Sequence, residues 1–190
     1  MKISDKLWAE YLKKTEHLWR RYSASEKQQR AMCEIIANLP ENSVVVELGV
    51  CHGLTAGLFL LAGQNNKTQY YGIDNFSLEA IPSVVKENLN KLNIPHKIIE
   101  SRTQDCPWDK PIDFLFIDAG HDEVNVKADC EKYIPFVKSG GYVSLHDYLD
   151  CADTSLNSAH WAVTYYGDLA TKGWKDIIFL ENQMIIRQKP

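Results

Sequence analysis

The stretch Val44-Val-Val-Glu-Leu-Gly-Val-Cys-His-Gly53 decides the fold. Its β-branched opening is typical of a strand that is buried on both faces of a parallel sheet. The glycines that follow let the backbone turn tightly and approach a ligand closely before a helix begins at about Leu54. In open α/β sheets, ligands bind beyond the carboxyl ends of the strands. The charged Glu47 inside this apolar strand needs a partner, so the stretch predicts a ligand site.

Strands and helices alternate along the rest of the chain. Strands are expected at 44–48, 70–73, 97–99, 112–117 and 142–145, and helices at about 54–62, 78–92, 123–137 and 161–171. This alternation predicts right-handed βαβ crossovers and a parallel sheet. Two further strand-like runs, 175–180 and 184–187, flank Glu181-Asn-Gln, which is a hairpin signal. An antiparallel strand is therefore expected at or near one edge.

The first 40 residues are expected to be helical. Apolar residues recur there at steps of three and four, which places them on one face: Leu7, Trp8, Tyr11, Leu12, Leu18, Trp19 and Tyr22. Ser25 and Gln28 can form a capping box for a second helix, which Pro40 ends. Core packing, a homodimer interface and a cover over the ligand site are the roles open to this aromatic face. We expect one domain over residues 1–190, with a helical extension over 1–40 and an α/β core over 43–188.

Composition limits the classes of function. The formal net charge is −4 and no basic run is longer than two residues, which argues against nucleic acid as a partner. No apolar stretch reaches the roughly 20 residues that span a bilayer, and the N-terminus lacks the apolar core of a signal peptide. The five cysteines are widely spaced and form no C-x-x-C pair. They predict reduced thiols in a cytoplasmic protein, not a disulfide framework or a zinc site.

Two classes of cofactor compete for the glycine loop. A dinucleotide site uses G-x-G-x-x-G, whereas this loop has Val50 and Cys51 where the middle glycine is needed. Glu47 would repel a pyrophosphate but suits a ligand that carries a sulfonium and an ammonium group. Asp74 ends the second strand, where a carboxylate accepts ribose hydroxyls. Together the two acids favour S-adenosylmethionine, and a nicotinamide oxidoreductase is the disfavoured alternative.

The second half of the chain brings a different set of polar side chains to the same edge of the sheet. Asp118 and His121 follow the most apolar strand, and His146 and Asp147 end the next one. Carboxylate oxygens with an imidazole suit Mg²⁺, Mn²⁺ or another divalent cation. A purely structural hydrogen-bond network among the same side chains is the alternative.

These motifs resemble those of the class I S-adenosylmethionine-dependent methyltransferases, from about Ser43 to Arg187. Glu47-Leu-Gly-Val-Cys-His-Gly53 matches the first motif of that superfamily, and Gly72-Ile-Asp74 matches the second. The resemblance implies an α/β fold with a doubly wound, Rossmann-like, seven-stranded, mostly parallel sheet that ends in an antiparallel β-hairpin. It also implies that the following residues hold the cofactor: Glu47, Gly49, Cys51, Gly53, Asp74, Asn75, Phe76, Ser101, Arg102 and Asp118.

The second set of motifs resembles the group that contains sugar O-methyltransferases and cephalosporin-hydroxylase-like proteins. That resemblance implies Asp118 and Asp147 as ligands of a divalent ion, His146 as a third ligand and His121 as the general base, beside Asp118 in the catalytic pair. Catechol-type methyltransferases have Asp-Asn where this chain has His146-Asp147, so a catechol substrate is not implied. The expected function is methyl transfer to a hydroxyl of a small molecule. A module that binds S-adenosylmethionine without transferring its methyl group is the alternative. His160-Trp161 is a candidate for the acceptor side, and a core tryptophan with a capping histidine is the favoured alternative.

Overall fold

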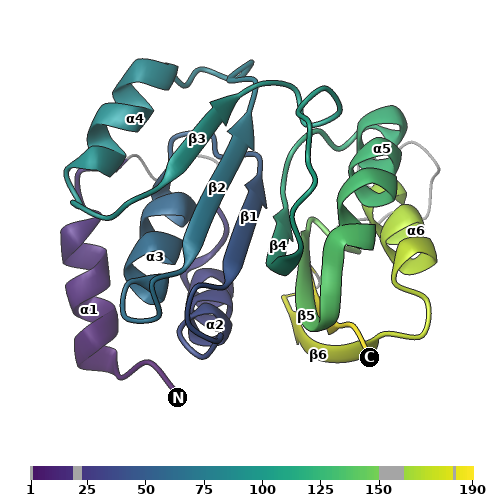
Figure 1. Ribbon diagram of the computed structural model, residues 1–190, viewed down its shortest axis with the longest axis horizontal. Helices are drawn as coiled ribbons and strands as arrows, with labels where there is room; N and C mark the ends of the chain where they lie inside the picture. Colours follow the sequence, from purple (N-terminus) through teal and green to yellow (C-terminus); the bar gives the residue numbers. More distant parts are fainter. Residues whose placement is uncertain (1, 19–22, 150–160, 182) are drawn as a thin grey trace.

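A seven-stranded sheet forms the centre of the computed structural model, which describes residues 2–18, 23–149, 161–181 and 183–190 (Figure 1). Its strands are β1 (Val44–Leu48), β2 (Gln69–Asp74), β3 (Lys97–Glu100), β4 (Ile112–Ile117), β5 (Val137–His146), β6 (Lys175–Leu180) and β7 (Met184–Gln188). Their order across the sheet is β3-β2-β1-β4-β5-β7-β6. Neighbours from β3 to β5 pair in parallel, and β7 pairs antiparallel with both β5 and β6. The predicted mixed sheet with its terminal hairpin is confirmed, and the reversed strand is β7, one place in from the edge.

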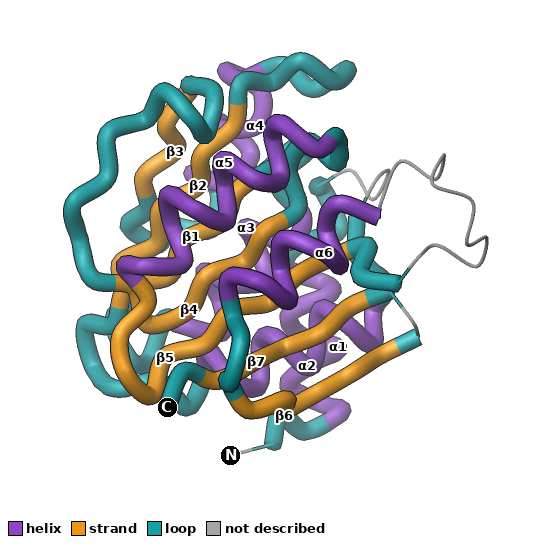
Figure 2. Tube along the Cα trace, turned by 90° about the vertical axis from the view of Figure 1, so that its right-hand side faces the viewer, coloured by secondary structure: helices purple, strands orange, loops and turns teal. Residues whose placement is uncertain are grey.

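Helices cover both faces of the sheet. They are α1 (Asp5–Lys14), α2 (Glu26–Ile36), α3 (Leu54–Gly63), α4 (Pro82–Asn90), α5 (Glu123–Tyr133) and α6 (Trp161–Ala170), with a short 3₁₀ helix η1 at Ile134–Phe136. The helices α1 to α4 pack on one face and α5 and α6 on the other, each set with its own apolar core. Figure 2 shows α5 and α6 across the face turned to the viewer and α1, α2 and α3 behind the sheet. None of the described helices is both long and apolar enough to cross a membrane.

The direction of the connections reverses beside β1. From β1 the chain moves outward to β2 and β3, and then it returns to β4 on the other side of β1. The loops that follow β1 and β4 therefore leave the sheet in opposite directions. A crevice opens at such a switch point, beyond the carboxyl ends of the strands. The glycine loop after β1 and the Asp118 loop after β4 form its two sides.

The N-terminal helices are part of the core. Trp8 and Tyr11 of α1 are buried, and α2 begins with the predicted capping box, in which Ser25 and Gln28 bond each other's backbone N–H. Core packing therefore accounts for the described part of the aromatic face, because α1 and α2 both pack against α3. Trp19, Tyr22 and His160 lie outside the described residues. Four described cysteines are free thiols, namely Cys33, Cys51, Cys106 and Cys130.

The N-terminal region is less helical than predicted, because α1 ends at Lys14 and so does not include Leu18, and α2 ends at Ile36, four positions before Pro40. Three further predicted boundaries are wrong, each for a local reason. The helix expected from Leu78 begins at Pro82, because proline suits the first helical position and leaves residues 78–81 as a loop. The helix expected to reach Val137 ends at Tyr133, and a 3₁₀ turn that contains Pro135 follows it. The fifth strand begins at Val137 and not at Tyr142, because an irregularity in its pairing with β4 takes up the two glycines Gly140 and Gly141.

Candidate cofactor and metal site

The crevice at the switch point holds two adjoining cavities. The first has a volume of about 440 Å³ and is lined by seven of the predicted site residues: Gly49, Cys51, Asp74, Asn75, Arg102, Asp118 and His121. The second has a volume of about 150 Å³ and is lined by residues that include Glu47, Gly53 and Ser23. Gly49, Cys51, Asp118 and His121 line both. The structure therefore gathers most of the predicted residues at one place.

Two of the residues predicted to hold the cofactor lie elsewhere. Phe76 and Ser101 line neither cavity as far as the described residues define them. The Ser101 N–H donates a hydrogen bond to the Asp74 carbonyl. Ser101 therefore extends the pairing of β3 with β2. Thr103 and Gln104, two positions further on, line the first cavity instead. The predicted loop therefore reaches the cavity through Arg102, Thr103 and Gln104, and Ser101 as a cofactor contact stays a prediction.

Gly49 allows the glycine loop to pass directly over the end of β4. Its φ is +90°, and a Cβ atom at this position would lie 2.1 Å from the carbonyl oxygen of Asp118. A side chain therefore cannot fit without a backbone shift. The Asp118 N–H in turn donates to the Leu48 carbonyl at 2.9 Å. These contacts hold the two sides of the crevice together at the floor of both cavities.

Glu47 points to the same face of the sheet as Tyr70, and the Tyr70 hydroxyl donates a hydrogen bond to its carboxylate. Gly72 is the residue opposite Glu47 in the register of β1 and β2. A Cβ atom at Gly72 would lie 2.8 Å from the Tyr70 hydroxyl oxygen, so the glycine leaves the room that this hydroxyl occupies. Only 1% of Glu47 is exposed. Burial raises its pKa well above the usual value, the Tyr70 hydrogen bond opposes that shift, and the charges of Asp118 and Asp74 add to it.

Asp74 braces the glycine loop. Its Oδ2 accepts the backbone N–H groups of Val50 and Cys51, both at 2.7 Å, and its Oδ1 accepts that of Phe76 at 2.5 Å. Cys51 and Phe76 both have positive φ values, 48° and 52°. Non-glycine residues adopt this region at a cost, so bonds that hold them there matter. Asp74 therefore shapes the loop in addition to facing the first cavity.

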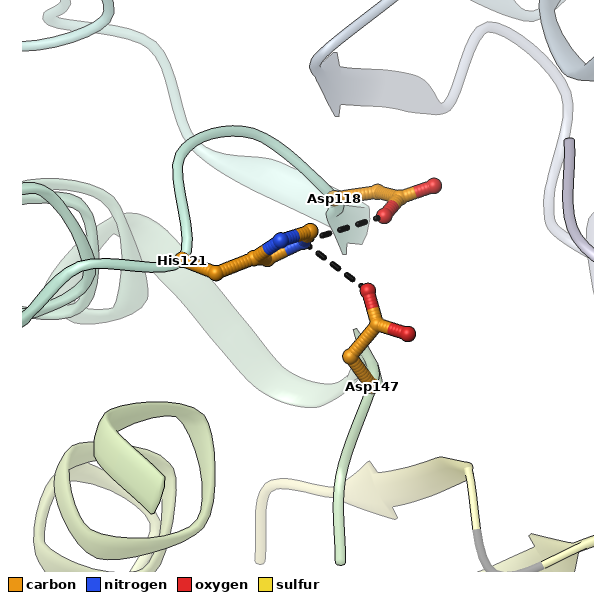
Figure 3. Close-up of side chains that lie close together, drawn as sticks. All are labelled: Asp118, His121 and Asp147. Carbon is orange, nitrogen blue, oxygen red and sulfur yellow. Dashed lines mark ion pairs between the residues drawn. The ribbon is translucent and has the colours of Figure 1, made fainter. Parts of the chain in front are cut away.

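Four titratable side chains converge on the opposite side of the crevice, and Figure 3 shows the His121 ring directed between the Asp118 and Asp147 carboxylates. His121 Nε2 lies 2.9 Å from Asp147 Oδ2 and 3.8 Å from Asp118 Oδ1. His146 Nδ1 lies 3.1 Å from the same Asp147 oxygen and 3.2 Å from the same Asp118 oxygen. Asp118, His121 and Asp147 each direct one ligand atom into a space that a metal ion could fill.

The two carboxylates hold protons on both imidazoles in the metal-free protein. Hydrogen bonds to Asp118 and Asp147 raise the pKa of His121 to about 9. Burial of the His146 ring opposes its charged form, but the charge and hydrogen bonds of the same two carboxylates outweigh this and raise its pKa to about 10. Burial likewise opposes the charged form of Asp147, yet its bonds to the two imidazoles hold its pKa well below the usual range. The cluster therefore needs positive charge at its centre.

Residues 46–148, more than half of the chain, match a family model described as a methyltransferase domain. The chain belongs to this family. The matched segment begins within β1 and ends just after Asp147, so it contains both sides of the crevice. No curated protein sequence matches this methyltransferase domain closely enough to count as a relative.

Solved methyltransferase structures share the whole fold with this methyltransferase at low sequence identity. PaMTH1 of Podospora anserina, solved with S-adenosylhomocysteine, has a TM-score of 0.71 at 14% identity, over 99% of this chain and 89% of that one. The O-methyltransferase TomG of Streptomyces achromogenes, solved with S-adenosylmethionine, has a TM-score of 0.64 at 12% identity, over 98% and 91%. An O-methyltransferase of Bacillus cereus, solved with S-adenosylhomocysteine, has a TM-score of 0.66 at 14% identity, over 98% and 92%. These likenesses confirm the predicted Rossmann-like fold.

Several residues of the methyltransferase site were not singled out from the sequence. Tyr70 bonds Glu47 from the neighbouring strand, and Leu78 lines both cavities from the loop before α4. Asp129 of α5 is fully buried behind the first cavity, where the Gln104 amide donates to it at 3.3 Å. The register of β1 and β2 signals Tyr70, because a residue two places from the partner of Glu47 shares its face. Asp129 could have been found in a similar way, because it lies among the apolar residues of α5 that face the core.

Proposed function

We propose that this methyltransferase is an S-adenosylmethionine-dependent O-methyltransferase that acts on a hydroxyl of a small molecule with the help of a divalent cation. One observation carries the proposal. The cavity of about 440 Å³ is shared by Gly49 and Asp74, which suit the cofactor, and by Asp118 and His121, which suit the chemistry. The bound S-adenosyl compounds and the O-methyltransferase names of the structural neighbours support the same choice.

The glycine loop and the two acids beside it fit the groups that S-adenosylmethionine carries. Gly49 lies against the Asp118 carbonyl, which leaves no space for a Cβ atom, and the loop that it begins lines both cavities. Glu47 lines the second cavity as a buried carboxyl group that lacks a cationic partner close by among the described residues, so a ligand ammonium would complete its environment. Asp74 faces the first cavity, where the remaining lone pair of its Oδ1 can accept a ribose hydroxyl. Asn75 and Arg102 line the outer part of that cavity.

The donors on the other side of the crevice fit a divalent cation. Asp118 and Asp147 each direct one carboxylate oxygen to the same space, and His146 adds a ring nitrogen. Hard oxygen donors with one imidazole suit Mg²⁺ or Mn²⁺. The His146 side chain is only 13% exposed, and its Nδ1 atom faces the two carboxylates and not solvent.

His146 and His121 differ in what they can reach. The His146 side chain is 13% exposed and lines neither cavity among the described residues, so it can hold an ion but not meet an acceptor. The His121 side chain is 33% exposed and lines both cavities. We therefore assign His146 as a metal ligand and His121 as the general base.

The chemistry follows from these roles. When bound, S-adenosylmethionine supplies an electrophilic methyl group and the divalent cation lowers the pKa of the acceptor hydroxyl. A cation held by Asp118 and Asp147 would offset the charge of the carboxylates that keeps a proton on His121. The neutral ring would then take the hydroxyl proton, and a positioned base of this kind contributes about 10²- to 10⁴-fold in rate. Asp118 and Asp147 would keep the base and the cation in fixed positions.

The test is a thermal-shift titration of the purified chain with S-adenosylhomocysteine and with NAD, each with and without Mg²⁺. A ligand that binds the native state raises the melting temperature by mass action. We expect stabilisation by S-adenosylhomocysteine and a further shift with Mg²⁺ that Asp118→Ala and Asp147→Ala abolish. Stabilisation by NAD alone would contradict the proposal. Cofactor binding without any response to Mg²⁺ or Mn²⁺ would remove the metal and favour a module that binds the cofactor without methyl transfer.

A further inference from the structure

The helix α2 reaches the candidate metal site through one side chain, that of Gln28. Gln28 is fully buried at the third position of the helix. Its Oε1 accepts the backbone N–H of Ser25 at 2.8 Å and lies 3.3 Å from Nε2 of His146. One oxygen atom thus closes the capping box of α2 and also touches a proposed ligand of the cation.

The capping box fixes the orientation of the Gln28 amide. The backbone N–H of Ser25 can only donate, so the atom that it contacts must be the amide oxygen and not the nitrogen. The other end agrees, because the Gln28 Nε2 atom makes no hydrogen bond within the described residues and so competes for no acceptor there. The His146 nitrogen that faces this oxygen must therefore carry a hydrogen atom.

A hydrogen on Nε2 determines what the other ring nitrogen of His146 can do. An imidazole that binds a cation is neutral, with one nitrogen as a donor and the other as the ligand atom. Nδ1 is then the atom with the free lone pair, and it lies 3.2 Å from Asp118 Oδ1 and 3.1 Å from Asp147 Oδ2. Three electron-rich atoms at these distances repel one another unless a cation lies between them. Nδ1 is therefore directed to the place where the two carboxylates also need positive charge.

We propose that Gln28 is a positioning residue for the cation site: its oxygen holds the hydrogen of His146 on Nε2 and leaves Nδ1 to bind the ion. The inference rests on the proposed metal-assisted function. Ligand imidazoles depend on such a partner on the second nitrogen, which fixes the tautomer and the ring orientation. The partner here comes from the N-terminal helical region, which lies outside the segment that matches the family model. The helix α2 thereby becomes part of the site and not only of its packing.

Calorimetric titration with Mn²⁺ in the presence of S-adenosylhomocysteine tests this role in three variants. Gln28→Met keeps the length of the side chain and removes the acceptor, and we expect its Mn²⁺ affinity to fall about 10- to 100-fold. Gln28→Glu retains an acceptor at the same position, and we expect affinity close to that of the wild type. Ser25→Ala is the matched control, because it removes the hydroxyl of the capping box but leaves the Ser25 N–H and Gln28 in place.

A second readout does not depend on affinity. Nitrogen-15 NMR of the His146 ring in the Mg²⁺-bound wild type should show a hydrogen on Nε2 and none on Nδ1, with His146→Asn used to assign the signals. Thermal unfolding of each variant verifies that it folds, and its affinity for S-adenosylhomocysteine should stay unchanged because Gln28 lines neither cavity among the described residues.

The outcomes separate this inference from the proposed function. Wild-type Mn²⁺ affinity in Gln28→Met, an equal loss in Ser25→Ala, or a hydrogen on Nδ1 would each overturn the role of Gln28 and leave the proposed function intact. A wild-type protein that binds S-adenosylhomocysteine but no Mn²⁺ would overturn both the cation and the role of Gln28. A wild-type protein that binds Mn²⁺ but no S-adenosylhomocysteine would overturn only the proposal that this chain binds S-adenosylmethionine.

Discussion

Tyr70 donates its hydroxyl hydrogen to Glu47 across the space left by Gly72. The acid of the first motif is thereby tied to the second strand two residues before the second motif begins. Since Glu47 is buried, this hydrogen bond is one of the few interactions that favour its ionised form against burial. A bound ligand ammonium would act in the same direction. The bond therefore prepares Glu47 for a cationic ligand and links the two halves of the cofactor site.

Tyr70→Phe should weaken both the fold and the cofactor site. The substitution leaves a buried carboxyl group without its donor, which costs about 1–3 kcal/mol in the free energy of unfolding. It also favours the neutral form of Glu47, so we expect a lower affinity for S-adenosylhomocysteine. Urea unfolding and calorimetry measure the two effects. Tyr71→Phe is the control on the neighbouring residue, because Tyr71 lies at the other face of the sheet, packed with the α5 and α6 core. Equal cofactor affinity in Tyr70→Phe and the wild type would contradict the role of this bond.

Gly49→Ala should destabilise the protein more than Gly140→Ala does. Both glycines have positive φ values, +90° and +77°, so both substitutions carry a backbone cost of about 1–3 kcal/mol. Only at Gly49 does the new Cβ atom meet the Asp118 carbonyl, whereas Gly140 has nothing within 4 Å. Chemical unfolding gives the two free energies, and their difference isolates the close approach. Equal losses of unfolding free energy would show that Gly49 is needed only for its positive φ. The contact with the Asp118 carbonyl would then tolerate a side chain.

Asp129→Asn should flatten the pH dependence of stability between about pH 4 and pH 7. Burial raises the pKa of Asp129 to about 7, against opposing effects of Thr103 and Lys132. The native state therefore binds more protons than the unfolded state in this range, and stability falls as the pH rises through it. One group contributes a slope of up to about 1.4 kcal/mol per pH unit. The asparagine variant lacks this slope. The difference between its free energy of unfolding and that of the wild type should therefore grow in its favour toward pH 7 and then stay constant.

Urea unfolding at several pH values measures that difference. Glu131→Gln is the matched control, because Glu131 is exposed on the same helix and its removal should leave the slope unchanged. A constant difference between Asp129→Asn and the wild type from pH 4 to pH 7 would mean that Asp129 is ionised in the native state.

The two histidines of the cluster should respond differently to substitution. His146→Ala removes a proposed ligand, so we expect Mn²⁺ affinity to fall by more than about tenfold. His121→Ala removes the proposed base, so Mn²⁺ affinity should change by much less. Calorimetry with both variants makes the comparison. The reverse order would assign His121 as the ligand together with Asp118 and Asp147, a grouping that their convergence also allows.

The central sheet could be predicted from the sequence because its signals are local. The run from Val44 to Leu48 is β-branched and apolar, and β1 has those bounds. The Ile112–Ile117 strand likewise agrees. Boundaries failed where a neighbouring strand decides the outcome: β5 starts at Val137 because its pairing with β4 absorbs the two glycines. A single sequence does not contain that register.

The site was predictable in its motifs but not in its supporting contacts. Glu47, Asp74, Asp118 and Asp147 end buried strands, and the carboxyl ends of neighbouring parallel strands bring such residues together. Gln28 is the opposite case, because 118 positions separate it from His146 and only the packing of α2 beneath the sheet joins them. Nothing local in the sequence marks a capping residue as a partner of a distant histidine.

The most direct test of the account is calorimetric titration of the purified chain with S-adenosylhomocysteine, with NAD as the competing ligand. We predict one binding site for S-adenosylhomocysteine per chain, no heat and no competition from NAD, and a large loss of affinity in Gly49→Ala, where the backbone approach is blocked. Binding of NAD in place of S-adenosylhomocysteine, or S-adenosylhomocysteine affinity that Gly49→Ala leaves unchanged, would contradict a cofactor site built on the loop after β1.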